Sequence, residues 1–202
     1  MNSQFKSAFN RLLHPLASAI AGTGISPSAI TLLGVALVAA SCAFLIVTRR
    51  LLLFCLLATL SSLLDVVDGA VARIQHTQTR AGSYLDAMCD RYAEAMVVLA
   101  VAYVTGYWTL SMLVVVGSLL VSYAKARAAM EVSVSNKEWP DLMERGERDV
   151  MYVIGLALGQ VAAWRPMGKD VFWWTLAVLA FLIHATVVQR MLRAGSLIRS
   201  RS

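Results

Sequence analysis

Six long apolar segments follow one another along the chain, and this succession constrains the fold more than any other feature. The segments cover about residues 28–47, 51–64, 81–104, 108–130, 149–164 and 171–191. An α-helix needs about 20 predominantly apolar residues to cross the hydrocarbon core of a bilayer. The sequence therefore predicts an all-α membrane protein with six transmembrane helices.

The composition excludes the other broad classes of protein. Of the 202 residues, 58% are hydrophobic and only 15% are charged, whereas a soluble domain has about 25% charged residues. So few charges cannot cover a water-facing surface, which argues against a soluble enzyme, a disordered chain and a coiled coil. The net charge of +6 comes without a long basic run, so we expect cationic loops of a membrane protein and no nucleic-acid partner.

The first 20 residues have the pattern of an amphipathic helix. Apolar side chains recur at spacings of three and four, at Phe5, Ala8, Phe9, Leu12, Leu16 and Ala19. This spacing is typical of a helix that lies in the membrane interface. A signal peptide would need its apolar run here, but that run begins only at Ser28. We expect a juxtamembrane helix and turn over 1–27, a six-helix domain over 28–195 and a basic tail over 196–202.

The lysines and arginines predict the orientation in the membrane. With six crossings, all but four of the 18 basic residues fall on one side, the exceptions being Arg49, Arg50, Arg165 and Lys169. Because positive charge accumulates on the cytoplasmic side, we expect both termini there. The acidic residues, except Asp170, fall on the same side, so the chemistry is predicted to face the cytoplasm.

Four aspartates stand where the second apolar segment ends and the third begins. Asp65 and Asp68 are three residues apart, and Asp86 and Asp90 are four apart, so each pair shares a helix face. Four carboxylates at short range do not all stay ionised without cations. Hard divalent cations such as Mg²⁺ or Mn²⁺ suit such a set; the alternative is a proton relay.

Small residues and one arginine accompany these aspartates. Gly69, Ala72 and Gly82 allow a ligand to approach the helix backbone closely. Arg73 has a forked set of donors that suits a phosphate. Together with metal-binding carboxylates, these residues predict a site that handles a pyrophosphate.

The stretch from Asp65 to Asp90 reads D-x2-D-G-x2-A-R-x8-G-x3-D-x3-D. It resembles the signature of the CDP-alcohol phosphotransferases, with every fixed position present. Residues 24–34 are also similar to the N-terminal region of that family. The resemblance implies an enzyme with six membrane helices, usually a homodimer, that transfers a phosphoalcohol from a CDP-linked donor and releases CMP.

The resemblance also implies a role for each residue of the signature. The predicted metal ligands, for two Mg²⁺ or Mn²⁺ ions per site, are Asp65, Asp68, Asp86 and Asp90. The predicted CDP-binding residues are Asp65, Asp68, Gly69, Ala72, Arg73 and Gly82. By the same resemblance Asp90 either shares the second ion or acts as the catalytic base, and its place on the ligand face suits it to take a proton from an attacking hydroxyl. Glu94 continues this face, and we expect it to support the ligands.

Three basic segments at the predicted cytoplasmic helix ends point to the acceptor. Residues 122–128, 144–148 and 189–190 resemble the branch of the family that makes phosphatidylinositol phosphate or, in archaea, archaetidylinositol phosphate. The resemblance implies CDP-diacylglycerol or CDP-archaeol as donor and inositol 1-phosphate as acceptor. The residues that it assigns to the acceptor's phosphate are Lys125, Arg127, Arg145, Arg148 and Arg190. The connection after Arg127 is longer than in that branch and contains Trp139 and Pro140.

Other functions remain open at this point. Within the family, glycerol 3-phosphate or serine are alternative acceptors. Outside it, intramembrane carboxylates also occur in divalent-metal transporters, which need ligands near the middle of the membrane and access from both faces. Here the acidic residues gather on one side, and a transporter does not explain Gly69, Ala72, Arg73 and Gly82.

Overall fold

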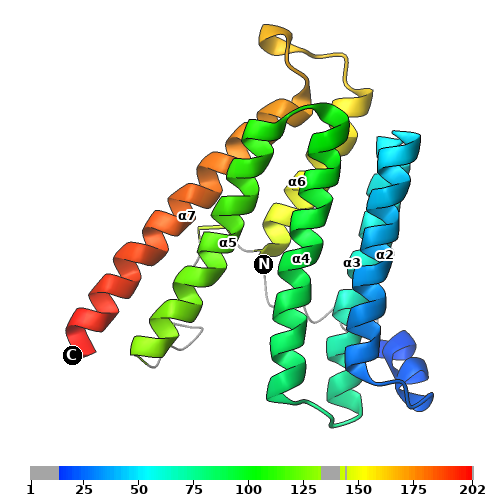
Figure 1. The fold of residues 1–202 in the computed structure, drawn as a ribbon, viewed down its shortest axis with the longest axis vertical. Helices are drawn as coiled ribbons and strands as arrows, with labels where there is room; N and C mark the ends of the chain where they lie inside the picture. Colours follow the sequence, from blue (N-terminus) through cyan, green and yellow to red (C-terminus); the bar gives the residue numbers. More distant parts are fainter. Residues whose placement is uncertain (1–13, 133–141, 144, 202) are drawn as a thin grey trace. The chain divides into compact units, whose positions relative to one another are not determined.

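The structure is a computed structural model that describes residues 14–132, 142–143 and 145–201, without the side chains of Leu63, Asp65 and Val66. Over these residues it is all-helical (Figure 1). The elements are α2 (Pro27–Thr48), α3 (Leu51–Ile74), α4 (Arg80–Thr105), α5 (Trp108–Glu131), α6 (Arg145–Val161), the short η2 (Pro166–Gly168) and α7 (Val171–Arg201). The predicted fold class is confirmed.

Four of these helices are long and apolar enough to cross a membrane: α2, α3, α5 and α7. The helix α6 has 17 residues, which is at the lower limit for a full crossing, about 17 residues. The helix α4 has 26 residues, but Asp86, Asp90, Arg91 and Glu94 interrupt the apolar character of its first half. The count of six crossings therefore stays a prediction. The helix α7 continues through 196–201, the predicted basic tail.

The chain divides into two compact units, Met1–Thr105 and Gly106–Ser202, and each is described by itself. In the first unit, α2 packs against both α3 and α4 (Figure 1). The helix α2 begins sharply because the Ser26 hydroxyl accepts a hydrogen bond from the Ala29 amide and Pro27 occupies the first helical turn. Thus one apolar helix holds the two helices that carry the aspartates.

A short helix over 14–22 packs on the first unit through small residues. Ala17 is fully buried in a cluster with Ile30 of α2 and Val67 and Val71 of α3, whereas Leu16 is half-exposed. The helix face that packs on α2 and α3 contains Ala17. It is adjacent to the predicted apolar face, which contains Leu16. The other predicted apolar positions, Phe5, Ala8, Phe9 and Leu12, lie outside the described residues.

Gln75 attaches this N-terminal segment to the end of α3. Its side-chain amide donates to the carbonyls of Ala21 and Ile25, at 3.1 and 3.2 Å. The Ala21 carbonyl lies at the end of the helix over 14–22 and the Ile25 carbonyl in the turn that precedes α2, and the carbonyls of a last helical turn lack helical partners. These two hydrogen bonds fix the start of α2 relative to the end of α3 that carries Asp68 and Arg73.

In the second unit, α7 packs against both α5 and α6. Glycines permit the close approach of α6 and α7: a Cβ atom on Gly159 would lie 2.7 Å from the Cβ of Phe172. At one end of this unit, the Tyr107 hydroxyl donates to Asp170 at 2.8 Å. The same carboxylate accepts from the Trp173 amide at 2.8 Å and so caps the start of α7.

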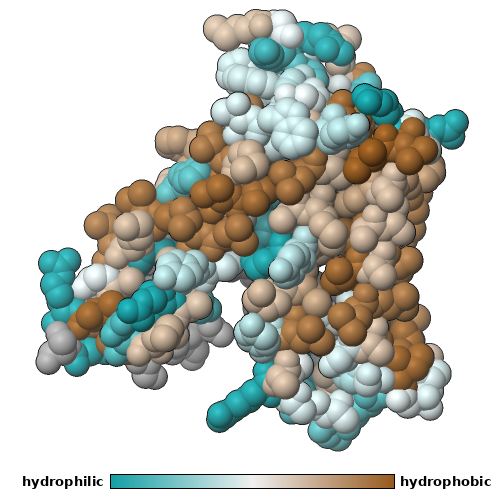
Figure 2. Space-filling model, in the orientation of Figure 1, coloured by the Kyte–Doolittle hydropathy of each residue, from teal (hydrophilic) through white to brown (hydrophobic). Residues whose placement is uncertain are grey.

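Large apolar side chains cover the outer surfaces of both units. Figure 2 shows hydrophobic residues along the helices and hydrophilic residues gathered toward their ends. Exposed examples are Leu32, Leu33, Leu52, Leu56, Met112, Leu119, Phe181 and Val188. Such extensive apolar surface is unfavourable in water and favourable against lipid tails, which agrees with a membrane protein.

Candidate active site

Asp68 is the most deeply buried of the signature aspartates that the structure describes. It lies on α3 and is 4% exposed. The hydroxyl of Thr31 on α2 donates to Asp68 Oδ2 at 2.5 Å. Since a buried carboxylate is costly without hydrogen-bond partners, this contact stabilises Asp68 in its buried position.

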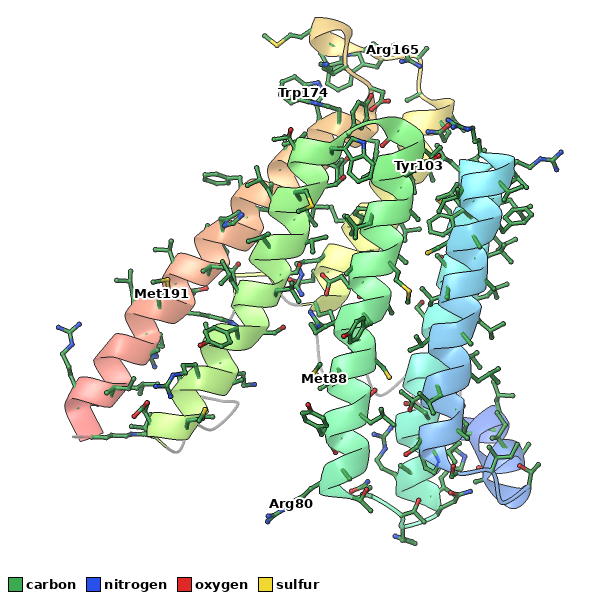
Figure 3. The ribbon with its side chains drawn as sticks, viewed as in Figure 1. Arg80, Met88, Tyr103, Arg165, Trp174 and Met191 are labelled. Atoms are coloured by element: carbon green, nitrogen blue, oxygen red, sulfur yellow. The ribbon has the colours of Figure 1, made fainter. Side chains whose placement is uncertain are left out.

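The helix α4 brings a second carboxylate to Asp68. Asp90 is half-buried and interacts electrostatically with Asp68, although the two residues are far apart in sequence. Asp86 is half-buried one turn earlier on the same face. Met88 lies between Asp86 and Asp90 in the sequence and is 40% exposed. Figure 3 labels Met88 on α4, farther along the helix than Arg80, with which α4 begins.

Arg91 connects two acidic residues of α4. Its guanidinium lies 2.6 Å from Glu94 and 4.0 Å from Asp90. Glu94 is thus paired with an arginine on its own helix that also approaches Asp90, and its predicted support of the aspartates stays a prediction.

Asp65 lies on α3 one turn before Asp68, but its side chain is outside the described part of the structure. Among the side chains that are described, three or more potential metal-binding groups of the His, Cys, Asp and Glu types do not come together. The donors present, carboxylate oxygens of Asp68, Asp86 and Asp90, are those that Mg²⁺ and Mn²⁺ prefer. The residue chemistry therefore fits a divalent cation.

The small residues of the signature lie where the helices turn or meet a polar group. Arg73 folds back along α3, so that a Cβ atom on Gly69 would lie 3.7 Å from an Arg73 guanidinium nitrogen. Gly82 stands in the first turn of α4, where its amide donates to the Thr79 hydroxyl at 3.0 Å. A side chain at Gly82 would crowd that hydroxyl at 3.1 Å. The capping role of Thr79 was not predicted.

Two arginines of the predicted acceptor site are buried in the second unit. Arg148 on α6 is 5% exposed and Arg190 on α7 is 7% exposed. The Arg190 guanidinium donates to the backbone carbonyl of Val121 on α5, one turn before Lys125, which is half-buried. Buried arginines are rare unless they are paired, so these two positions mark a polar region inside an apolar helix bundle.

The other two predicted acceptor residues lie in more exposed positions. Arg127 pairs with Glu131 at 2.6 Å, one turn along α5. Both residues line a groove of about 560 Å³ between α5 and α7, which is otherwise mostly apolar. Arg145 lies 3.6 Å from Asp149, one turn along α6. Burial separates Arg148 and Arg190 from Arg127, a distinction that the sequence motifs do not make.

A helical fold with apolar outer surfaces and carboxylates set into two of its helices defines a membrane protein with a polar site. The family model of the CDP-alcohol phosphatidyltransferases matches residues 24–182. This chain belongs to that family, and it is a transferase.

Two curated relatives illustrate the similarity. The phosphatidylinositol phosphate synthase of Corynebacterium glutamicum is 31% identical over 192 residues, which cover 91% of this chain and 84% of the relative. The archaetidylinositol phosphate synthase of Methanothermobacter thermautotrophicus is 31% identical over 197 residues, which cover 95% of this chain and 93% of the relative.

Solved structures of a third relative have the same fold. The Mycobacterium tuberculosis phosphatidylinositol phosphate synthase with CDP-DAG bound matches with a TM-score of 0.79 at 25% identity, covering 91% of this chain and 94% of that one. Its complex with manganese and citrate matches with a TM-score of 0.77 at 26% identity, covering 89% of this chain and 87% of that one. Divalent metal binding therefore occurs in this family.

Proposed function

We propose that this protein transfers a phosphatidyl or archaetidyl group from a CDP-linked lipid to inositol 1-phosphate and releases CMP. The observation that carries the proposal is the complete signature from Asp65 to Asp90, with Asp68 buried and Asp90 interacting with it across two helices. The similarity to inositol phosphate synthases from bacteria and archaea supports the acceptor.

In this proposal the first unit holds the donor. Asp65, Asp68, Asp86 and Asp90 would hold two Mg²⁺ or Mn²⁺ ions, which would neutralise the pyrophosphate charge. Arg73 binds a phosphate oxygen of the CDP group through its forked donors. Gly69, Ala72 and Gly82 leave room for the nucleotide, since a Cβ atom on Gly69 has only Arg73 nearby.

The chemical step exchanges one phosphorus–oxygen bond for another. A hydroxyl of inositol 1-phosphate attacks the lipid-side phosphorus, and the bond from that phosphorus to CMP breaks. Asp90 accepts the proton of the attacking hydroxyl. Its half-buried position at the edge of the carboxylate group leaves it more accessible than Asp68, which suits a base that must reach a substrate.

The second unit supplies the cations for the acceptor's phosphate. Lys125, Arg148 and Arg190 come from three helices. Arg148 and Arg190 are buried, which supports a role in binding an anion over a role as solvated surface charge. Arg127 and Arg145 contribute from more exposed positions. A buried phosphate needs several charge-assisted donors to offset its loss of hydration.

We also propose that both termini and the site face the cytoplasm and that the protein is a homodimer. The uneven distribution of lysine and arginine supports the orientation. The homodimer rests on the resemblance to the family.

The experiment compares acceptors with purified protein, radiolabelled CDP-diacylglycerol and Mg²⁺. We expect a labelled lipid product and CMP with inositol 1-phosphate, and little product with free inositol, serine or glycerol 3-phosphate. Equal use of free inositol would remove the need for a phosphate site. Preference for glycerol 3-phosphate would keep the donor chemistry and replace the acceptor.

A further inference from the structure

Thr31 differs from the other threonines that the described helices contain. Threonine in a helix commonly donates to the carbonyl four residues earlier, and five helical threonines do so here at 2.7–2.9 Å: Thr48, Thr59, Thr105, Thr175 and Thr186. Thr31 lies 3.1 Å from the equivalent carbonyl, that of Pro27, but 2.5 Å from Asp68 Oδ2. Its hydroxyl is therefore drawn away from its own helix toward α3.

The single proton of this hydroxyl serves one strong acceptor. A hydroxyl has one O–H donor, and a bond to a carboxylate is shorter and stronger than a bond to a neutral carbonyl. Thr31 is 8% exposed and Asp68 is 4% exposed, so water competes little for either group. The proton is therefore committed to Asp68.

The bond also fixes the orientation of the Asp68 carboxylate. The terminal torsion of an aspartate is broad and weakly held by itself. The Thr31 hydroxyl donates to Oδ2 of this carboxylate from the neighbouring helix α2. This bond holds Oδ2 in place and so restricts rotation of the carboxylate group, which also limits where its other oxygen can lie.

We propose that Thr31 is a positioning residue that orients Asp68 to bind the divalent cation. The proposal rests on the proposed function, in which Asp68 is a metal ligand. Hydrogen-bond partners that orient a metal ligand typically contribute about 10- to 100-fold to metal affinity. Thr31 touches neither substrate nor metal; it acts through Asp68.

The test measures Mn²⁺ binding to the purified full-length protein without lipid substrate, by titration with electron paramagnetic resonance of free Mn²⁺. Thr31→Val keeps the shape of the side chain and removes the hydroxyl, and we expect about 10- to 100-fold weaker binding. Thr31→Ser keeps the hydroxyl and is expected to restore most of the affinity. Thr59→Val is the matched control, because the Thr59 hydroxyl donates to the Cys55 carbonyl; its affinity should equal that of the wild type.

A second readout separates positioning from a structural role. In Thr31→Val, saturating Mn²⁺ should restore most of the turnover rate, since the missing bond affects occupancy of the metal site. Equal Mn²⁺ affinity in wild type and Thr31→Val would overturn the inference and leave the proposed function intact. Equally weak binding in Thr31→Ser would also overturn it. Failure of the wild type to bind Mn²⁺ at millimolar concentration would instead overturn the metal assignment of the proposed function, and the inference with it.

Discussion

Asp68 and Asp90 have the same side chain in different surroundings, and the proposed roles follow from that difference. Asp68 is buried and accepts the Thr31 hydroxyl, so its orientation is fixed. Asp90 is half-buried and lies 4.0 Å from Arg91. Two carboxylates in different environments commonly take different catalytic roles. Here the fixed carboxylate suits a ligand and the more accessible one suits a base.

We predict that Asp90→Asn reduces turnover by about 10²- to 10⁴-fold, the usual contribution of a general base. CDP-lipid binding in the presence of Mg²⁺ should remain measurable, because Asp68 and Asp86 are unchanged. Turnover is followed with radiolabelled CDP-lipid, and binding by calorimetry on the same preparation. A variant that keeps more than about a tenth of the wild-type rate would contradict the role of base, given that range.

At the scale of elements, the contact of α6 with α7 depends on Gly159, which has no side chain to separate the two helices. A Cβ atom on Gly159 would lie 2.7 Å from the Phe172 Cβ and 3.1 Å from the Phe172 amide nitrogen. These atoms cannot swing away as the end of a flexible side chain can. In a membrane, where close packing drives helix association, such contacts decide stability.

We predict that Gly159→Ala destabilises the protein by about 1–3 kcal/mol, the usual cost of overpacking. Gly146→Ala is the control, because Gly146 lies on the same helix with open space around it. Thermal unfolding in detergent, followed by circular dichroism, should show a lower midpoint only for Gly159→Ala. Equal midpoints for the two variants would mean that α6 and α7 do not pack at this glycine.

The start of α7 is secured by a polar link whose stability depends on pH. Burial, together with the hydrogen bond and charge of Asp170, raises the pKa of Tyr107 to about 12, although Arg165 opposes this shift. In an unfolded chain the pKa of tyrosine is about 10. The unfolded state therefore loses the proton first, and the stabilisation is present below about pH 10 and lost as the pH rises through about 12.

We accordingly predict that wild-type protein loses its stability advantage over Tyr107→Phe between about pH 10 and pH 12. The measurement is the thermal midpoint of both proteins as a function of pH. Parallel curves over that range would show that the Tyr107 hydroxyl does not keep its bond to Asp170.

The sequence predicts the helices well and the contacts between them poorly. Each apolar run is long enough to specify a helix by itself, so the predicted start near Ser28 and the observed start at Pro27 nearly coincide. The Thr31–Asp68 bond joins positions 37 residues apart, and local patterns carry no information on such pairs. Thr31 is one of several hydroxyl residues in its apolar run, and nothing in the local pattern indicates its partner. Burial of Ala17 in place of Leu16 likewise depends on the shape of the surface that receives it.

At the scale of the whole molecule, the two units divide the proposed substrates between them. The residues assigned to the donor, including Arg73, lie in Met1–Thr105, and those assigned to the acceptor, including Arg148 and Arg190, lie in Gly106–Ser202. A charge removed from one unit should then affect one substrate. We therefore predict a separation of Michaelis constants that a general loss of folding would not produce.

The most direct test measures the KM for both substrates in Arg73→Gln and Arg190→Gln. A charge-assisted contact is worth about 1.5–3 kcal/mol, which corresponds to a loss of about 10- to 100-fold. We predict that Arg73→Gln raises the KM for CDP-lipid and Arg190→Gln raises the KM for inositol 1-phosphate, with the other constant nearly unchanged in each. An equal rise of both constants in Arg190→Gln would contradict the account, because it would make this buried arginine a support of α5 through Val121 and not a ligand of the acceptor.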